Sequence, residues 1–248
     1  MGMVAASFYR VGAVQMKRND RWLGAAAAAV FLTAAGVAAA GHAAAEACPD
    51  VQLVFARGTF EPAGVGGVGQ AFADSLRAKT PGKSVDVYAV NYPASLDFAT
   101  AADGVIDARN KVMATVNSCP NTKVVLGGYS QGAAVAAYIT EDHVPQGFAL
   151  PPGLTGPMPT SAADHVAAVV LFGKPSSGFL QMIFTGAPPI TVGPRYVGKT
   201  DDVCIAEDPV CSPTGNDQGA HGAYPARGLT DQAADYVVNR LGGSANRT

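Results

Sequence analysis

The chain has 248 residues, of which 48% are hydrophobic and 15% are charged, and its formal net charge is −2 at pH 7. A chain of this length and apolar content can bury one sizeable core, and its weakly acidic balance argues against a nucleic acid as partner. No repeat or linker interrupts the sequence, which argues against a second folded domain.

The N-terminal segment has the features of a secretory signal. Three basic residues precede an apolar stretch at residues 22–40, and small residues follow it. This is the order of a signal's charged, apolar and cleavage regions. We favour cleavage over a membrane anchor because alanine and glycine, which dominate the stretch, gain little from hydrocarbon. A lipid anchor on Cys48 is disfavoured by the charge of Glu46. The expectation is a signal peptide at 1–45, a folded domain at 46–248, and a secreted, extracellular protein that could associate with the cell envelope.

Strand-like and helix-like segments alternate along the rest of the chain. We predict strands at residues 51–56, 85–90, 123–127, 166–172 and 195–198, and helices at 68–79, 99–117, 230–241 and directly after residue 130. Strands rich in Val and Leu that alternate with helices form a parallel sheet covered on both faces. The sequence therefore predicts a three-layer α/β fold with a central, mostly parallel five-stranded sheet. An active site in such a fold lies at the carboxyl ends of the strands.

Residues 128–132 read Gly-Tyr-Ser-Gln-Gly and lie between an apolar, strand-like run and a run of small, helix-forming residues. A G-x-S-x-G turn in this position holds its serine in a strained conformation that exposes the hydroxyl above the sheet, and the glycines avoid clashes. The following helix aims free N–H groups at the place where an oxyanion would form. A chance match is the alternative in a chain with 29 glycines, but the context favours Ser130 as a nucleophile.

A serine nucleophile needs a histidine base, and three histidines remain after residue 45. His143 lies near the far end of the helix that starts at Ser130, about 20 Å away at 1.5 Å per residue. His165 directly precedes a strand and should lie at the wrong edge of the sheet. His221 follows the last predicted strand, where the base falls in the chain order Ser, Asp, His, so we expect it to be the base.

Four aspartates lie between the last predicted strand and His221. Asp208 stands between two cysteines and before a proline, which would stiffen the carboxylate that must hold the imidazole tautomer. Asp217 is the rival, and we expect Asp201 and Asp202 to be solvated loop or capping residues.

All four cysteines lie in the exported part, and an even number in an oxidising compartment favours two disulfides. Of the three pairings, the short spacing favours Cys204 with Cys211, which leaves Cys48 with Cys119. A metal site is disfavoured because there is no C-x-x-C and the histidines do not cluster near the cysteines. We expect no metal and no organic cofactor.

Segments that span nearly the whole exported part resemble the cutinases, particularly the secreted bacterial cutinase-like esterases. They are 48–55, Ala-Arg-Gly-Thr at 56–59, Asn-Tyr-Pro at 91–93, Gly-Tyr-Ser-Gln-Gly at 128–132, Glu-Asp-Pro-Val-Cys at 207–211 and Ala-His-Gly-Ala-Tyr at 220–224. In that family these patterns carry the nucleophile, the acid and the base, which implies Ser130, Asp208 and His221 here. The resemblance also implies an α/β-hydrolase fold and the disulfides Cys48–Cys119 and Cys204–Cys211. It implies an oxyanion hole made by the Gln131 backbone N–H and by the hydroxyl and N–H of Thr59.

The chain departs from the family pattern in two places. Glu207 replaces the glycine usual before the acid, which adds a second carboxylate. Residues 212–220 are polar where polymer-degrading cutinases carry an apolar loop, so cutin is a doubtful substrate. The apolar run at 179–184 is either core or a compensating surface for the acyl chain. Loops rich in Gly and Pro at 58–69, 145–162 and 174–194 could shape a substrate cleft.

These features predict a secreted serine carboxylesterase that hydrolyses short- to medium-chain acyl esters through an acyl-enzyme. The same site would serve a lipase or phospholipase, a thioesterase, an acyltransferase on envelope lipids or a cutin esterase, because fold does not fix substrate. An exported, antigen-like binding protein with a vestigial site is the non-enzymatic alternative. The expected partners are an ester or lipid substrate and, transiently, a lipid surface, and we expect a monomer.

Overall fold

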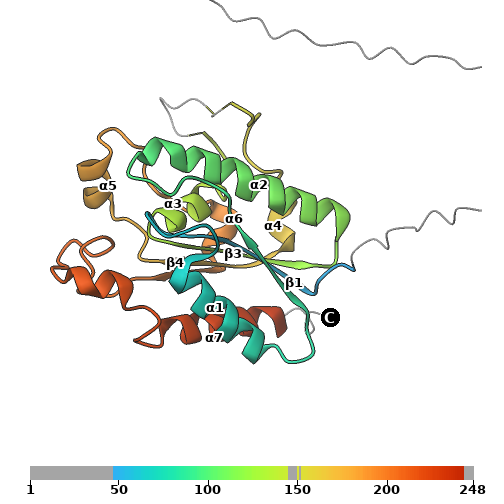
Figure 1. Ribbon diagram of the computed structural model, residues 1–248. Helices are drawn as coiled ribbons and strands as arrows, with labels where there is room; N and C mark the ends of the chain where they lie inside the picture. The colour runs from blue at the N-terminus through green and yellow to red at the C-terminus, as the bar shows by residue number, and fades with distance from the viewer. Residues whose placement is uncertain (1–46, 145–149, 151, 243–248) are drawn as a thin grey trace, which may run out of the picture. The chain divides into compact units, whose positions relative to one another are not determined.

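Five parallel strands form the sheet at the centre of the chain (Figure 1). The computed structural model describes residues 47–144, 150 and 152–242, and its strands are β1 (Val51–Ala56), β2 (Val85–Ala89), β3 (Lys123–Tyr129), β4 (Val166–Phe172) and β5 (Thr200–Val203). Their order is β2-β1-β3-β4-β5, and every neighbouring pair runs parallel. The predicted sheet is therefore confirmed. The signal peptide predicted at 1–45 lies outside the described residues.

The predicted position of the last strand is wrong. Residues Pro194–Val197 form a short helix, α6, and the strand follows at Thr200–Val203. Proline is favourable in the first turn of a helix, which accounts for α6. β5 is an edge strand that pairs with β4 alone among the described strands, so backbone hydrogen bonds place it despite its polar sequence. Asp201 and Asp202 therefore lie within a strand and not in the loop after it.

The long helices cover both faces of the sheet (Figure 1). They are α1 (Gly66–Lys79), α2 (Ala101–Ser118), α3 (Gln131–Tyr138) and α7 (Leu229–Gly242). The helix after Ser130 is shorter than predicted, because it ends at Tyr138 and does not reach His143. The described residues also form short helical segments, which are η1 (Phe98–Thr100), at the start of the helix predicted at 99–117, and α4 (Ala162–His165), α5 (Ser177–Ile183) and η2 (Gln218–Gly222).

Each face of the sheet has its own hydrophobic core. Successive strand residues point to opposite faces. Val54 and Leu126 therefore pack with α2 and α3, whereas Leu53 and Phe55 pack with α1 and α7. Because both faces are covered, the edge formed by the strand ends is the place left for a site.

The carboxyl ends of the central strands lie side by side. Ala56 pairs with Gly128, and Tyr129 pairs with Phe172. The segments that follow β1, β3 and β4 therefore leave the sheet at one edge.

Among the described residues, none of the helices combines the length and the apolar character that a membrane span requires.

Both predicted disulfides are present. Cys48 is bonded to Cys119, and the pair joins the segments that enter β1 and β3. Cys204 is bonded to Cys211 in the loop that follows β5. The second disulfide thus lies on the chain segment that carries Asp208.

Candidate active site

Ser130 lies in a strained turn between β3 and α3. Its backbone has φ +56° and ψ −120°, a positive-φ conformation that non-glycine residues rarely adopt. Gly128 and Gly132, on either side of this serine, let the turn pack closely against neighbouring backbone. A Cβ on Gly128 would lie 2.0 Å from the Gly132 carbonyl oxygen, and a Cβ on Gly132 would lie 2.0 Å from the Ala56 carbonyl oxygen. The Ser130 N–H donates to the Phe172 carbonyl at 2.9 Å, which fixes the turn to β4.

The structure brings Ser130, His221 and Asp208 together. His221 Nε2 lies 2.9 Å from Ser130 Oγ, and His221 Nδ1 lies 2.8 Å from Asp208 Oδ2. With the proton on Nδ1 donated to Asp208, the Nε2 lone pair faces the serine hydroxyl and can accept its proton. Ser130 lies between β3 and α3, Asp208 lies in the loop after β5, and His221 lies in η2. Only the folded chain therefore brings the three side chains together.

Asp208 has no exposed surface and is held by several donors. The Val210 N–H donates to Oδ1 at 2.9 Å, and the Tyr224 hydroxyl donates to Oδ2 at 2.7 Å. Burial, and then the hydrogen bond to Asp208, raise the pKa of the Tyr224 hydroxyl, so this phenol stays a neutral donor. A buried carboxylate needs such partners. They also fix the direction from which it meets His221.

His221 is held from its backbone as well as through its ring. The Tyr129 hydroxyl donates to the His221 carbonyl at 2.8 Å, and the two rings lie 5.0 Å apart. Burial raises the pKa of Tyr129, which keeps its hydroxyl protonated. Sequence reasoning did not assign roles to Tyr129 and Tyr224. Tyr129 directly precedes Ser130, and Tyr224 follows His221 by three residues. This spacing is the feature of the sequence that points to them.

The other histidines and aspartates lie elsewhere or have other partners. His165 ends α4 directly before β4, at the amino edge of the sheet, as expected. Asp217 accepts the Gly219 N–H at 2.8 Å and caps η2. Asp202 lies 3.3 Å from the Lys174 ammonium. Burial raises the pKa of Asp201 within β5.

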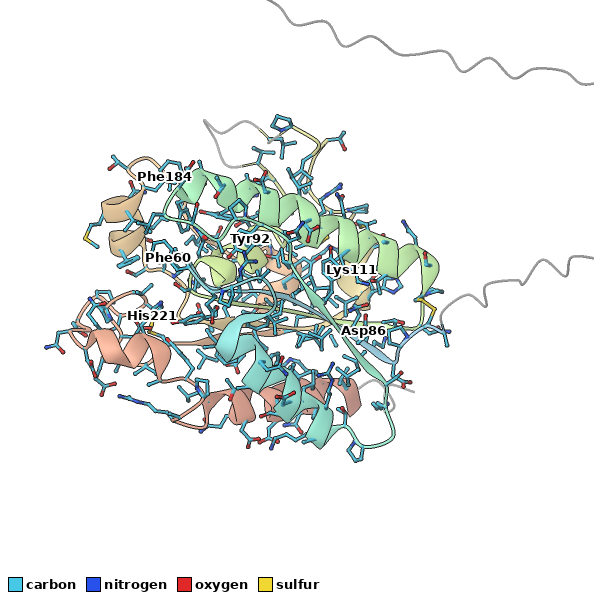
Figure 2. All side chains as sticks on the ribbon, viewed as in Figure 1. Phe60, Asp86, Tyr92, Lys111, Phe184 and His221 are labelled. Carbon is cyan, nitrogen blue, oxygen red and sulfur yellow. A yellow bond between two sulfur atoms is a disulfide. The ribbon has the colours of Figure 1, made fainter. Side chains whose placement is uncertain are left out.

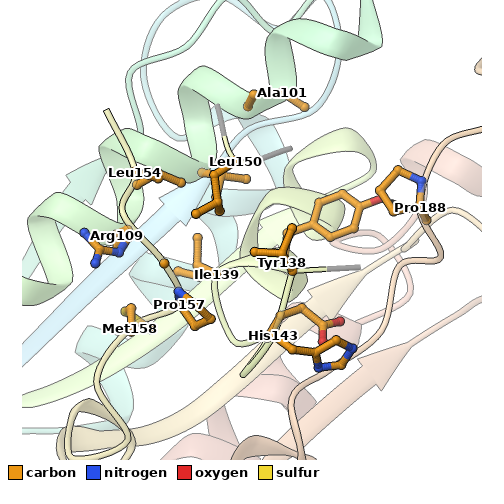
Figure 3. Close-up of a pocket in the computed structure, with 15 residues that line it drawn as sticks. Ala101, Arg109, Tyr138, Ile139, His143, Leu150, Leu154, Pro157, Met158 and Pro188 are labelled. Atoms are coloured by element: carbon orange, nitrogen blue, oxygen red, sulfur yellow. Dashed lines mark hydrogen bonds between the residues drawn. The ribbon is translucent and has the colours of Figure 1, made fainter. Parts of the chain in front are cut away.

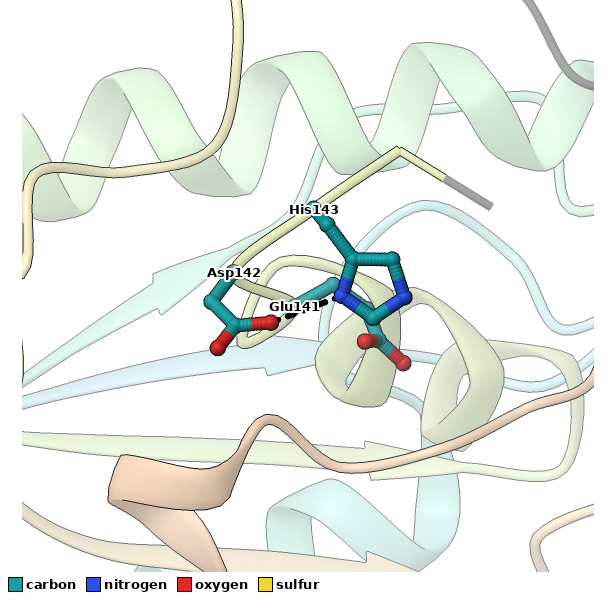
Figure 4. Close-up of side chains that lie close together, drawn as sticks. All are labelled: Glu141, Asp142 and His143. Carbon is teal, nitrogen blue, oxygen red and sulfur yellow. Dashed lines mark hydrogen bonds and ion pairs between the residues drawn. The ribbon is translucent and has the colours of Figure 1, made fainter. Parts of the chain in front are cut away.

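His143 belongs to a group of three titratable side chains that follows the end of α3 (Figure 4). Its Nδ1 lies 2.7 Å from Asp142 Oδ1, and potential ligand atoms of Glu141, Asp142 and His143 lie within 4.8 Å of one another. Glu141 accepts a hydrogen bond from the Thr191 hydroxyl. Exposed acidic groups of this kind are common without an ion, and we assign no metal to this one.

An apolar cavity of about 190 Å³ lies between α2 and the end of α3 (Figure 3). Its lining includes Val105, Tyr138, Ile139, Met158 and Pro188. Ser130, Asp208 and His221 are not among the lining residues, so this cavity is separate from the hydrogen-bonded group around Ser130.

The two residues expected to donate to the oxyanion, Gln131 and Thr59, follow the carboxyl ends of the neighbouring strands β3 and β1. Gln131 is the first residue of α3, so its N–H has no partner within the helix. The Gln131 side chain is 1% exposed and donates from Nε2 to the Ser95 carbonyl at 2.9 Å. Thr59 lies in the turn that follows β1, the neighbour of β3.

Glu207 points its charge away from the buried Asp208. Its carboxylate is half exposed and pairs with the Arg227 guanidinium at 2.8 Å. This hydrogen bond lowers the pKa of Glu207. The family departure at this position thus adds an exposed ion pair.

The apolar run at residues 179–184 divides between core and surface. Leu180 is buried, whereas Met182 is 71% exposed and Phe184 packs on Phe98 with ring centroids 6.2 Å apart. Phe60 and Leu96, which follow β1 and β2, are also exposed. Figure 2 shows Phe60, Phe184 and His221 at one end of the sheet and Asp86 and Lys111 at the other. Apolar side chains therefore surround the end that holds His221.

Comparisons with known proteins identify the family of this chain. The cutinase family model matches residues 47–241. Carboxylesterase Culp1 of Mycobacterium tuberculosis is 47% identical over 215 residues, which cover 86% of this chain and 92% of the relative. Phospholipase Culp4 of the same organism is 44% identical over 90% of this chain and 96% of its own. The structure of Trichoderma reesei cutinase in complex with a phosphonate inhibitor aligns with a TM-score of 0.57 and 32% identity, over 78% of this chain and 77% of that one. The chain belongs to the cutinase family.

Proposed function

We propose that this protein is a secreted serine carboxylesterase that hydrolyses short- to medium-chain acyl esters. The observation that carries the proposal is the continuous hydrogen-bonded series from Ser130 Oγ through His221 to the buried Asp208. Such a series can make a serine hydroxyl nucleophilic at neutral pH.

Ser130 Oγ attacks the ester carbonyl carbon while its proton passes to His221 Nε2. The resulting oxyanion accepts hydrogen bonds from the Gln131 N–H and from Thr59. Collapse of the tetrahedral intermediate breaks the bond to the alcohol oxygen, which takes the proton from His221. Water then attacks the acyl-enzyme, gives a proton to His221, and releases the acid as Ser130 regains its hydrogen.

Asp208 stabilises the imidazolium that forms in each step. The Tyr224 hydroxyl and the Val210 N–H keep that carboxylate in place. Both are neutral donors that hydrogen-bond to it without transferring a proton. Tyr129 holds the backbone of His221.

A lipid substrate is the second candidate, supported by the exposed apolar side chains around this end of the sheet. Phe60 is 74% exposed and Leu96 is 76% exposed, which is unusual for large apolar residues in water. A transient contact of these side chains with a lipid surface would bring acyl chains to Ser130. The name of the relative Culp4, a phospholipase, is in line with this candidate.

The polar loop at residues 212–220 gives no support to cutin as substrate. The two disulfides support an oxidising compartment, hence export. We propose a monomer outside the cell. N-terminal sequencing of the chain from culture medium and size-exclusion chromatography would check both points.

The test of the function is Ser130→Ala. We expect kcat for a short-chain ester to fall roughly 10⁴-fold or more in a folded protein, because only binding and oxyanion contacts remain. An organophosphonate should label wild-type protein covalently at Ser130 and leave the variant unlabelled. Hydrolysis near the wild-type rate by folded Ser130→Ala would refute the proposal, and wild-type protein that neither labels nor hydrolyses would favour a binding protein.

A panel of substrates separates the enzymatic candidates. It comprises esters of increasing acyl length, a phospholipid and a thioester, each measured with wild type and with Ser130→Ala as the blank. The highest kcat/KM on short to medium esters supports the carboxylesterase, and the highest value on phospholipid supports the lipid candidate.

A further inference from the structure

The turn that carries Thr59 has an unusual backbone. The Glu61 N–H donates to the Gly58 carbonyl at 3.2 Å and closes a turn with Thr59 and Phe60 at its centre. Phe60 has φ +65°, a conformation that costs a non-glycine residue energy. The Phe60 side chain is 74% exposed and cannot hold this conformation by packing. Other groups must therefore hold the turn.

The Glu61 carboxylate joins this turn to the start of α1. Its Oε2 accepts the Gly58 N–H at 2.6 Å, and its Oε1 accepts the Gly67 N–H at 2.7 Å. A Cβ on Gly66, which has φ +72°, would lie 2.1 Å from Glu61 Oε2, so glycine is required for the carboxylate to enter.

Helix α1 has no capping side chain of its own. Val65 at the N-cap makes no side-chain hydrogen bond, and the first turn holds no acidic residue. Glu61 therefore supplies both the acceptor and the negative charge that a helix N-terminus favours. The 14-residue helix in turn gives the carboxylate a fixed anchor.

Arg57 and the loop after β2 hold the other side of the turn. Arg57 is 7% exposed and donates from Nε to the Glu61 carbonyl at 2.8 Å and from Nη2 to the Tyr92 carbonyl at 2.6 Å. The Phe60 N–H donates to the Ala94 carbonyl at 2.8 Å. Figure 2 shows Phe60 at the same end of the molecule as His221.

We propose that Glu61 is a positioning residue for the oxyanion hole: it fixes the turn that presents Thr59 by joining the Gly58 N–H to the N-terminus of α1. The inference rests on the proposed function, in which Thr59 contacts the oxyanion. Glu61 acts through Thr59 and does not touch the substrate. A displacement of about 1 Å at such a site can cost on the order of 10²-fold in rate.

The direct test is Glu61→Gln, which keeps the size of the side chain. In the carboxylate each oxygen accepts one N–H, that of Gly58 or that of Gly67. The amide replaces one of these oxygens by an NH₂ group, which is a donor and cannot accept the N–H that it would face. We expect kcat per phosphonate-titrated site to fall roughly 10- to 10²-fold with KM within about twofold of wild type. Glu61→Asp, which keeps the charge, should recover part of the loss.

Asp50→Asn is the matched control. Asp50 Oδ2 accepts the backbone N–H of Ser84 at 2.7 Å, a bond between chain segments like those of Glu61, but directly before β1 at the amino edge of the sheet. This variant should keep the kcat of wild type even where its melting temperature falls. A loss of kcat equal to that of Glu61→Gln would show a general effect of destabilisation and overturn the inference.

Coupling to Thr59 separates positioning from a merely structural role. Thr59→Ala and the double variant Thr59→Ala with Glu61→Gln complete a cycle. If Glu61 acts through the turn, the double variant should lose clearly less than the product of the single losses. A double loss equal to that product, or a Glu61→Gln enzyme with wild-type kcat, overturns the inference. Thr59→Ala removes the hydroxyl and keeps the backbone N–H, so its full activity would show that the hydroxyl is not the group that Glu61 positions and would overturn the inference as the cycle tests it, while Ser130→Ala would still decide the esterase function independently.

Discussion

Asp208 and Asp217 show how the surroundings of a carboxylate decide what it can do. Both lie in the polar segment before His221, and both accept a backbone N–H. Asp208 is completely buried and has the His221 ring and the Tyr224 hydroxyl as further partners. Asp217 is exposed and caps η2. A charge is retained in the interior only with such partners, so the buried residue is the one built to face the imidazole.

We expect Asp208→Asn to lower kcat by about 10⁴-fold, because the amide favours the wrong imidazole tautomer and cannot stabilise the imidazolium. Asp217→Asn should be nearly silent, since its amide oxygen can still accept the Gly219 N–H. Steady-state hydrolysis of a short-chain ester, with circular dichroism to confirm folding, measures both. The reverse ranking of the two variants would mean that the acid has been wrongly assigned.

At the scale of elements, the loop from Cys204 to Cys211 is a small structure of its own. The Asp208 N–H donates to the Ile205 carbonyl at 2.9 Å, and the Ser212 N–H donates to the Asp208 carbonyl at 2.9 Å. The disulfide closes this loop next to the end of β5. The loop, and not a helix or strand, therefore brings Asp208 to His221.

Removing this disulfide should reduce activity before it unfolds the protein. A short closed loop contributes about 2 to 3 kcal/mol in the chain-entropy model, whereas a shift of about 1 Å at Asp208 can cost on the order of 10²-fold in rate. The double variant Cys204→Ser with Cys211→Ser should thus retain its far-UV circular dichroism spectrum and hydrolyse a short-chain ester more slowly.

The pair Cys48→Ser with Cys119→Ser is the control for that experiment, because its disulfide joins segments at the entry to β1 and β3. It should lose stability with little change in kcat. Full activity without the Cys204–Cys211 disulfide would show that the hydrogen bonds of the loop suffice to place Asp208, and simple unfolding would show that the disulfide is structural first.

At the scale of the whole molecule, the tyrosines that pack in or against the two cores share one electrostatic property. Burial is the leading cause of a raised pKa for every tyrosine that the structure describes, namely Tyr88, Tyr92, Tyr129, Tyr138, Tyr196, Tyr224 and Tyr236. Tyr196, for example, is raised from 10.0 to about 12. The folded chain therefore resists the ionisation of these phenols.

The consequence is a loss of stability at alkaline pH. A group with a raised folded-state pKa contributes its full stability below its unfolded pKa, here 10.0, and loses it as pH rises toward the folded value. We expect unfolding to begin above about pH 10. Phenolate absorbance should lag behind that of the urea-unfolded chain and then rise together with the loss of circular dichroism. A native-state titration centred at pH 10, with the fold intact, would contradict this expectation.

The sequence predicted most of the fold because the fold depends on local patterns. Buried runs rich in Val and Leu marked β1, β3 and β4, and Val-Asp-Val-Tyr-Ala marked the less buried β2. The helical pattern marked the long helices. The edge strand β5 was misplaced, since its Thr-Asp-Asp-Val sequence has no apolar period and only pairing with β4 defines it. α5 and η2 are too short for any period to show.

For the site, the sequence by itself determined the chemistry at each position: a serine in an elbow motif, an aspartate between two cysteines, and a histidine three residues before a tyrosine. Only the tertiary structure decided that these side chains meet, that Asp208 is buried and Asp217 is not, and that Glu61 reaches both Gly58 and the start of α1. The physical reason is that hydrogen bonds and burial depend on distances between segments that lie far apart in the chain. No local pattern encodes those distances, and they exist once both faces of the sheet are covered and the strand ends are fixed side by side.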